Sequence, residues 1–282
     1  MMQKAIIARA LLENALRKAI EQQQFHLHYQ IQVDSTGEHL GAEVLIRWQH
    51  PERGLVSPLD FIALAEDTGV ILPIGQWVLD TVCAQLKTWE QDPLTRDIVL
   101  AINVSAKQLH QVDFVGQVLA TLQRHGTNPT RLKLELTESM LIDNIQDVIA
   151  KMTALKKAGI SFSLDDFGTG YSSLQYLKML PLEQLKIDQS FVRDIATDRD
   201  DRTIVRTIIT MAASLGINVI AEGVATVEQH RFLLDNGCLH FQGYLFSKPV
   251  PIEAFETLLK KAACTCRTVS TADRQCCEII AW

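Results

Sequence analysis

Charged and amide side chains recur at or near the ends of short apolar segments in this sequence. The set comprises Glu43, Asn103, Glu135, Asp165, Asp166, Lys186, Asp188, Glu222 and Gln242. Burying a single unpaired charge costs on the order of several kcal/mol. For any one of these residues alone, a salt bridge or a helix cap would be the simpler explanation. Their recurrence across separate segments instead predicts that they gather in one site.

The chemistry of this set favours divalent metal ions. It contains no histidine or cysteine, and hard oxygen ligands suit Mg²⁺ or Mn²⁺ better than zinc or iron. Clustered carboxylates repel one another unless cations join them, and Asp165 or Asp166 could bridge two ions. Two metals about 3.5–4 Å apart clamp the attacking and leaving oxygens of a phosphoryl transfer. With Lys186 as a further positive charge for water or a phosphate oxygen, the residues alone predict a two-metal phosphoester hydrolase.

Two neighbouring features bear on this site but leave alternatives open. Residues 166–173 read DFGTGYSS, where the glycines permit a tight turn and Ser172 or Ser173 could cap a helix. This segment is either an ordinary strand-to-helix loop or a mobile loop that orders the aspartate pair. Arg47 could bind a phosphate through two hydrogen bonds, although an isolated arginine is more often a surface residue.

The elements that must position these side chains alternate between β-branched runs and helical patterns. The predicted strands are Phe25–Val33, His39–Trp48, Ile98–Val104, Leu132–Thr137, Ser161–Asp165, Gln184–Asp188, Asn218–Glu222 and Leu239–Gln242. From the second strand on, each is followed by a helical segment, which indicates βα units. One such helix has Ile204, Ile208, Met211 and Leu215 at the spacing of one apolar face, and Gly216 would end it.

The first two strands depart from this alternation. Only Asp34–Glu38 separates them, and such a short turn forces an antiparallel pair. The sequence therefore predicts an α/β fold, a TIM-like (β/α)8 barrel with one antiparallel strand. In such barrels the carboxyl ends of the strands meet at one mouth, where active sites lie, and the strands are expected to be apolar on their inner side.

Length and charge agree with this interpretation. The chain has 282 residues, and one α/β barrel typically needs about 250. Its net charge of -6 disfavours nonspecific binding to DNA or RNA, which needs many Lys and Arg residues. No apolar run reaches the ~20 residues of a membrane span and no secretory signal is evident, so we expect a cytoplasmic protein.

The ends of the chain lie outside the repeating pattern. We expect a barrel over residues 1–263, with an amphipathic N-terminal helix at about 8–22. Residues 264–282 contain Cys264, Cys266, Cys276 and Cys277, whose spacing fits zinc sites poorly. This tail is predicted to be disordered, with a metal or redox role as the alternative.

Over roughly residues 8–260 the chain resembles the EAL domain family. Its signature triplet reads Glu43-Val44-Leu45, with valine in place of the usual alanine. The other motifs match in order and spacing: HYQ at 28–30, INVS at 102–105, ELTES at 135–139, DDFGTGYSS at 165–173, KID at 186–188, AEGV at 221–224 and QGYLFSKP at 242–249. One departure is Ile31, where the family usually has proline, and this could loosen a turn beneath the ligand.

The resemblance implies a role for each matching residue. Glu43, Asn103, Glu135 and Asp165 resemble ligands of a first metal. Asp165 resembles a bridge to a second metal, with Asp166 beside it, and Glu222 resembles a ligand or a water-positioning carboxylate of that second metal. Lys186 resembles the residue that contacts the catalytic water, and Asp188 matches a further acidic position. Glu138 matches the residue that holds the DFGTG loop. The nucleotide contacts implied in the same way are Gln30, Leu45, Arg47, Gln242 and Pro249.

The activity implied by the resemblance is hydrolysis of one 3′–5′ phosphodiester of cyclic di-GMP to linear pGpG, with two Mg²⁺ or Mn²⁺ ions and inhibition by Ca²⁺. The alternatives are an inactive EAL domain that only binds cyclic di-GMP and an unrelated metal-dependent barrel enzyme such as a lyase. Family members often form homodimers through helices near the DFGTG loop. Many also carry sensory or GGDEF domains on the same chain.

Overall fold

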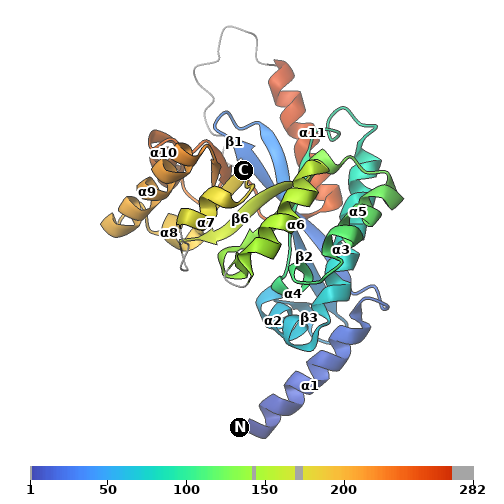
Figure 1. Ribbon diagram of the computed structural model, residues 1–282. Coiled ribbons are helices and arrows are strands. Elements are labelled where there is room, and N and C mark those ends of the chain that lie inside the picture. Colours follow the sequence, from blue (N-terminus) through green and yellow to red (C-terminus); the bar gives the residue numbers. More distant parts are fainter. Residues whose placement is uncertain (1, 142–143, 169–173, 269–282) are drawn as a thin grey trace.

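Eight strands close a barrel in the computed structural model, which describes residues 2–141, 144–168 and 174–268 (Figure 1). They are β1 (Phe25–Asp34), β2 (His39–His50), β4 (Val99–Asn103), β5 (Leu132–Thr137), β6 (Ser161–Phe167), β7 (Gln184–Ile187), β8 (Asn218–Ala221) and β9 (His240–Gln242). They pair in this order, and β9 pairs with β1 to complete the ring. The predicted α/β barrel is therefore confirmed.

The first strand runs against its neighbours, as the short turn predicted. Strand β1 is antiparallel to both β2 and β9, whereas the pairs from β2 through β9 are parallel. The turn is held by Asp34, whose Oδ1 accepts the backbone N–H groups of Thr36 and Glu38 at 2.7 and 2.9 Å. Gly37 follows with a φ of +81°, a left-handed conformation that glycine adopts without strain.

Helices cover the outside of the barrel. They are α1 (Met2–Ala19), α2 (Pro58–Thr68), α3 (Ile71–Trp89), α4 (Ala106–Leu109), α5 (Phe114–His125), α6 (Ile145–Lys157), α7 (Leu174–Met179), α8 (Gln189–Arg193), α9 (Arg199–Leu215), α10 (Val227–Asp235) and α11 (Ile252–Thr268). Two short strands, β3 (Gly54–Val56) and β10 (Val250–Pro251), were not predicted. Among the described residues no single helix is long and apolar enough to cross a membrane; α2 and α3 pass that test only as a pair bent by 118°.

The apolar core lies between strands and helices, and the inside of the barrel is polar. Alternate residues of β5 illustrate this, because Leu132, Leu134 and Leu136 belong to the core, while Lys133 and Glu135 face inward. The expectation of an apolar inner side was therefore wrong. Hydrogen bonds across the barrel stabilise this polar interior, since burying a polar group costs free energy mainly when it lacks a hydrogen-bond partner.

The lower part of the barrel interior shows how such groups are satisfied. Lys133 Nζ donates to Gln184 Oε1 at 3.0 Å, and Gln184 Nε2 lies 3.4 Å from His240 Nδ1. Lys133 also forms an ion pair with Glu183 at 3.4 Å. This network shares no residue with the cluster of charged side chains at the barrel mouth.

The predicted segments at the two ends of the chain differ from the structure. The N-terminal helix spans residues 2–19 rather than 8–22, because it continues back to Met2. Helix α11 reaches Thr268, so the segment from 264 to 268 is helical rather than part of a disordered tail. Residues 269–282, the rest of that predicted tail, lie outside the described residues. The other two cysteines, Cys83 and Cys238, are buried thiols.

The apolar face of α9 is also shifted from the predicted one. Its buried residues are Val205, Ile208, Ile209 and Ala212, whereas Ile204 and Leu215 are 37% and 36% exposed. Of the predicted residues Ile208 is buried, and the buried face of the helix is rotated from the predicted face. The end of the helix was predicted correctly, because Gly216 caps it in the left-handed conformation.

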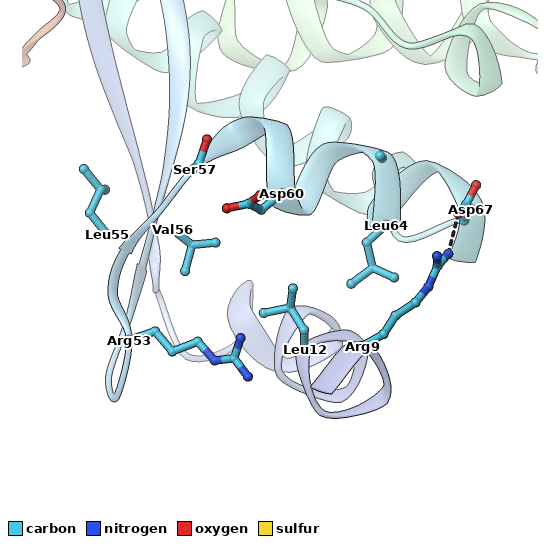
Figure 2. Close-up of a pocket in the computed structure, with 10 residues that line it drawn as sticks. Arg9, Leu12, Arg53, Leu55, Val56, Ser57, Asp60, Leu64 and Asp67 are labelled. Atoms are coloured by element: carbon cyan, nitrogen blue, oxygen red, sulfur yellow. Dashed lines mark hydrogen bonds and ion pairs between the residues drawn. The ribbon is translucent and has the colours of Figure 1, made fainter. Parts of the chain in front are cut away.

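Helix α1 packs on α2 beside the β2–β3 hairpin. Leu16 and Ala19 of α1 share a buried cluster with Phe61 and Leu64 of α2. A groove of about 590 Å³ remains between these elements, and Figure 2 shows Arg9 reaching across it to Asp67 in an ion pair. One face of α2 thus supports the N-terminal helix.

Candidate active site

The buried ammonium group of Lys186 joins four carboxylates at the carboxyl-terminal mouth of the barrel. Strand β7 carries this side chain into the interior, where it is 0% exposed. Its Nζ lies 2.6 Å from both Glu135 Oε2 and Glu222 Oε1. It lies 3.1 Å from Asp165 Oδ2 and 3.4 Å from Glu43 Oε2. Residues from β2, β5 and β6 and the end of β8 are therefore brought together, as the sequence predicted.

The carboxylate of Glu43 is also oriented by two amide groups. Asn103 Nδ2 donates to Glu43 Oε1 at 2.8 Å, and Gln242 Nε2 donates to Glu43 Oε2 at 2.6 Å. Strand register explains the first contact, because Glu43 of β2 pairs with Ala101 of β4, two residues before Asn103. With its Nδ2 engaged, Asn103 retains its Oδ1 as an oxygen that could bind a metal.

A bulge brings two consecutive aspartates to the same opening. The register of β6 against β7 shifts between Leu164 and Phe167, and Asp166 has a φ of +55°. In a regular strand adjacent side chains point to opposite faces, whereas the bulge lets Asp165 and Asp166 line one pocket. Asp tolerates the left-handed conformation better than most residues. The backbone N–H of Asp166 donates to Asp165 Oδ1 at 2.9 Å, which holds the pair together.

The cluster carries more negative charge than Lys186 balances. Burial, together with the charges of Glu43 and Asp165, raises the pKa of Glu135 to about 8 although Lys186 opposes the shift. Burial also raises the pKa of Glu222 well above its ordinary value. The pKa of Asp166 rises to about 6 through burial and the nearby charges of Asp165 and Asp188. An added divalent cation would relieve this excess charge.

Glu43 and Lys186 remain the charged pair at the centre. Burial alone would raise the pKa of Glu43, but Lys186 and the hydrogen bonds from Gln242 and Asn103 lower it below its ordinary value. Burial would lower the pKa of Lys186, yet the surrounding carboxylates raise it well above the ordinary value. Both groups are therefore held in their charged forms.

The donor set fits a divalent cation that prefers oxygen. Carboxylate oxygens of Glu43, Glu135 and Asp165 all lie within 4.8 Å of one another. Glu135 Oε1 is buried and has no hydrogen-bond partner among the described residues. A buried carboxylate oxygen without a donor is costly, and a metal ion is one way to satisfy it. These three residues, with the oxygen of Asn103, match the preference of Mg²⁺ and Mn²⁺ for hard ligands.

A pocket of about 500 Å³ opens beside this cluster. Asn103, Asp165 and Asp166 lie at its polar part, and the predicted ligand contacts Leu45 and Arg47 line it as well. Apolar residues of α2 and α3 form another wall, and they are Pro58, Leu59, Ile62, Ala63, Ile71, Ile74 and Val78. This wall was not predicted from the sequence. The sequence signal that could have indicated it is the helix start at Ser57-Pro58, followed by a largely apolar segment. In the structure Leu59 of this segment is 88% exposed.

The other predicted ligand contacts lie behind Glu43. Gln30 is buried, accepts a hydrogen bond from Gln242 Nε2 at 3.2 Å and donates to the carbonyl of Ser247 at 3.2 Å. The carbonyl oxygen of Pro249 lies 3.3 Å from His28 Nδ1. Ile31 lies within β1, paired with Ala42 and only 3% exposed, so the expectation that it loosens a turn was wrong.

Two acidic residues lie around the aspartate bulge without joining the Lys186 cluster. Glu138 is buried in a short 3₁₀ turn (η2, Glu138–Leu141), and its Oε2 accepts the backbone N–H of Gly168 at 3.3 Å. Gly168 has a φ of +99°, so the anchored backbone is one that glycine favours. Asp188 caps α8 by accepting the N–H of Ser190 at 3.0 Å. Residues 169–173 of the loop, including Ser172 and Ser173, lie outside the described residues.

Comparisons with known proteins agree on one family. The family model described as "EAL domain" matches residues 13–249. Over 239 residues the chain is 43% identical to the bifunctional diguanylate cyclase/cyclic di-GMP phosphodiesterase MucR of Pseudomonas aeruginosa, covering 84% of this chain and 35% of MucR. It is 41% identical over 250 residues to the cyclic di-GMP phosphodiesterase PdeR of Escherichia coli, covering 89% of this chain and 38% of PdeR. The chain thus spans well under half the length of these relatives.

Solved structures give the same result. The phosphodiesterase of PaMucR in complex with c-di-GMP superposes with a TM-score of 0.83 at 42% identity, covering 86% of this chain and 98% of that one. The EAL domain of Mycobacterium smegmatis DcpA superposes with a TM-score of 0.73 at 38% identity, covering 84% and 98%.

Proposed function

This chain belongs to the EAL domain family, and from that membership we propose that it hydrolyses one 3′–5′ phosphodiester of cyclic di-GMP to give linear pGpG. The observation that carries the proposal is the cluster of four carboxylates around Lys186 at the barrel mouth. Relatives named as cyclic di-GMP phosphodiesterases and a related structure in complex with c-di-GMP support the choice of substrate.

The residues assigned to metal binding all offer oxygen atoms. A first Mg²⁺ or Mn²⁺ would be held by Glu43, Asn103, Glu135 and Asp165, and a second by Asp165, Asp166 and Glu222. Bound at these positions, the cations supply Lewis acidity for activating water and for neutralising charge on the phosphodiester. A binding-only role would not require so complete a set of donors.

The charged side chains beside the metal residues are proposed to complete the reaction site. Lys186 contacts the catalytic water and places a positive charge where negative charge develops on the phosphoryl oxygens. Glu222, 2.6 Å from Lys186 Nζ, helps to orient that water. Asp188, near Asp166, contributes to the local negative charge that attracts the metal.

The pocket walls are proposed to select a purine nucleotide with two phosphate groups. Arg47 can bind a phosphate oxygen, and Leu45 with the apolar wall of α2 and α3 can cover a base. Gln30, Gln242 and Pro249 are the remaining proposed nucleotide contacts. A cytoplasmic location, a homodimer and further domains on a longer chain also remain predictions.

Incubation of the protein with cyclic di-GMP and Mg²⁺ or Mn²⁺ tests the proposed function. Chromatography of the products should show pGpG forming with time. Binding of cyclic di-GMP without any pGpG would instead identify a receptor. If the protein neither binds nor hydrolyses cyclic di-GMP, both roles are refuted, and the apolar wall must then bind another ligand.

Replacing Glu138 with alanine should lower kcat roughly 10- to 100-fold and raise the Mg²⁺ concentration needed for half-maximal rate. The reason is that Glu138 Oε2 holds the N–H of Gly168, next to the bulge that places Asp165 and Asp166. The test is the reaction rate of the wild type and of Glu138→Ala measured as a function of Mg²⁺ concentration. High Mg²⁺ should restore part of the rate of the variant.

Glu138→Gln is the matched control, because its amide oxygen can still accept the N–H of Gly168 and should preserve most of the activity. If Glu138 only stabilises the following turn, the alanine variant should lose about 1 kcal/mol of stability. Its Mg²⁺ dependence would then superimpose on that of the wild type after scaling.

A further inference from the structure

We propose that Gln32, which no sequence motif singled out, is a positioning residue of the active site that acts through Gln242 on the carboxylate of Glu43. The inference rests on the proposed function in that Glu43 is taken as a metal ligand. Gln32 lies on β1, opposite Gln242 on β9 in the strand register, and its side chain is only 5% exposed. It faces the polar interior of the barrel.

An unbroken series of hydrogen bonds connects Gln32 to the metal site. Gln32 Nε2 donates to Gln242 Oε1 at 2.8 Å. Gln242 Nε2 in turn donates to Glu43 Oε2 at 2.6 Å and to Gln30 Oε1 at 3.2 Å. All four side chains are buried, so water cannot easily replace any of these partners.

The chemistry of the groups requires this orientation of Gln242. Ionised Glu43 offers only acceptors, so the amide NH₂ of Gln242 must face it, and the carbonyl oxygen of Gln242 must then face β1. Gln32 supplies the N–H donor at that position. A reversed amide would bring two acceptor oxygens together at Glu43 and two NH₂ groups together at Gln32. Gln32 therefore fixes the orientation in which Gln242 can hold Glu43.

Removal of the Gln32 amide should weaken the hydrogen bond from Gln242 to the proposed metal ligand Glu43. Gln242 Oε1 would be left buried without its donor, and the amide would gain by turning toward another partner and away from Glu43. Groups that orient metal ligands typically change metal affinity or activity about 10- to 100-fold when removed. The same range is expected here, although Gln32 touches neither the substrate nor the metal in the proposed reaction.

Gln32→Met tests the inference, because methionine has nearly the same shape but cannot donate a hydrogen bond. Titration calorimetry should show Mn²⁺ binding at least about 10-fold more weakly than in the wild type, and kcat should fall with little change in KM. A cycle with Gln242→Met should be non-additive, so that the double variant binds Mn²⁺ no more weakly than Gln242→Met alone. Gln32→Asn, which keeps a shorter amide, should show a smaller defect and serves if the methionine variant does not fold.

Gln184→Met is the matched control. Gln184 is another glutamine of the barrel interior, 4% exposed, but it is bonded to Lys133 and His240 in the separate lower network. Its replacement should cost stability and leave Mn²⁺ affinity unchanged. The inference is overturned if the Gln32 variants bind Mn²⁺ like the wild type, or if the defects of Gln32→Met and Gln242→Met simply add. Because Mn²⁺ binding is measured without substrate, a wild type that binds Mn²⁺ but makes no pGpG would count against the proposed function alone.

Discussion

Replacing Glu43 or Asp165 with alanine is expected to abolish hydrolysis of cyclic di-GMP while the protein stays folded. The loss should be on the order of 10³-fold or more in kcat, comparable to removal of a principal electrostatic stabiliser of a transition state. Each substitution removes one of the three carboxylates whose oxygens lie within 4.8 Å of one another. Steady-state production of pGpG at saturating Mg²⁺ measures the effect.

The fold should survive because neither residue belongs to the apolar core. Lys186 keeps three carboxylate partners when one is removed, so its buried charge stays compensated. Loss of Asp165 also removes a negative charge that raises the pKa of Glu135 and of Asp166. Thermal unfolding should therefore show a melting temperature equal to or above that of the wild type in the absence of metal.

Metal binding provides the second readout for these variants. A ligand that binds only the folded state stabilises it, so Mn²⁺ should raise the melting temperature of the wild type. The rise should be small or absent in Glu43→Ala and Asp165→Ala. Glu21→Ala, which changes an exposed glutamate just after the N-terminal helix, is the control and should behave like the wild type. Near-normal turnover in either active-site variant would remove that residue from the ligand set.

The strands could be predicted from the sequence because their periodicity and their turns are local properties. Leu132–Thr137 was predicted at its observed limits, and the other seven barrel strands differ only at their ends. The antiparallel first strand followed from the length of a single turn. The positions of Glu135 and Lys186 near the carboxyl ends of their strands were enough to predict that they lie together, because parallel strands share one mouth.

What the sequence did not predict depends on contacts between distant segments. The contact of Gln32 with Gln242 joins residues 210 positions apart, and it depends on the register of β1 against β9. The bulge at Asp166 depends on how β6 meets β7, and no residue in the segment signals it alone. The apolar pocket wall arises because α2 and α3 fold over the mouth, which periodicity along either helix does not reveal.

Removal of divalent metal is expected to stop the reaction completely. In excess chelator the rate should fall to the background, and added Mg²⁺ or Mn²⁺ should restore it, because the carboxylates alone provide no Lewis acid. Ca²⁺ should bind but not restore turnover, since it prefers bonds of about 2.3–2.6 Å and looser geometry, compared with about 2.0–2.1 Å for Mg²⁺. Added to the Mg²⁺ enzyme, Ca²⁺ should therefore inhibit, and excess Mg²⁺ should reverse the inhibition.

The stoichiometry of this metal requirement distinguishes one ion from two. Titration of the metal-free protein with Mn²⁺ in the presence of a slowly hydrolysed substrate analogue should show two ions bound per chain. Asp166→Asn should weaken the second ion more than the first, because Asp166 lies at the pocket but outside the three-carboxylate group. Glu135→Gln should weaken the first ion, because it reduces the charge of a group with a buried oxygen that lacks a partner among the described residues. Full turnover in excess chelator, or equal losses for both ions in both variants, would contradict the assignment of two distinct metal positions.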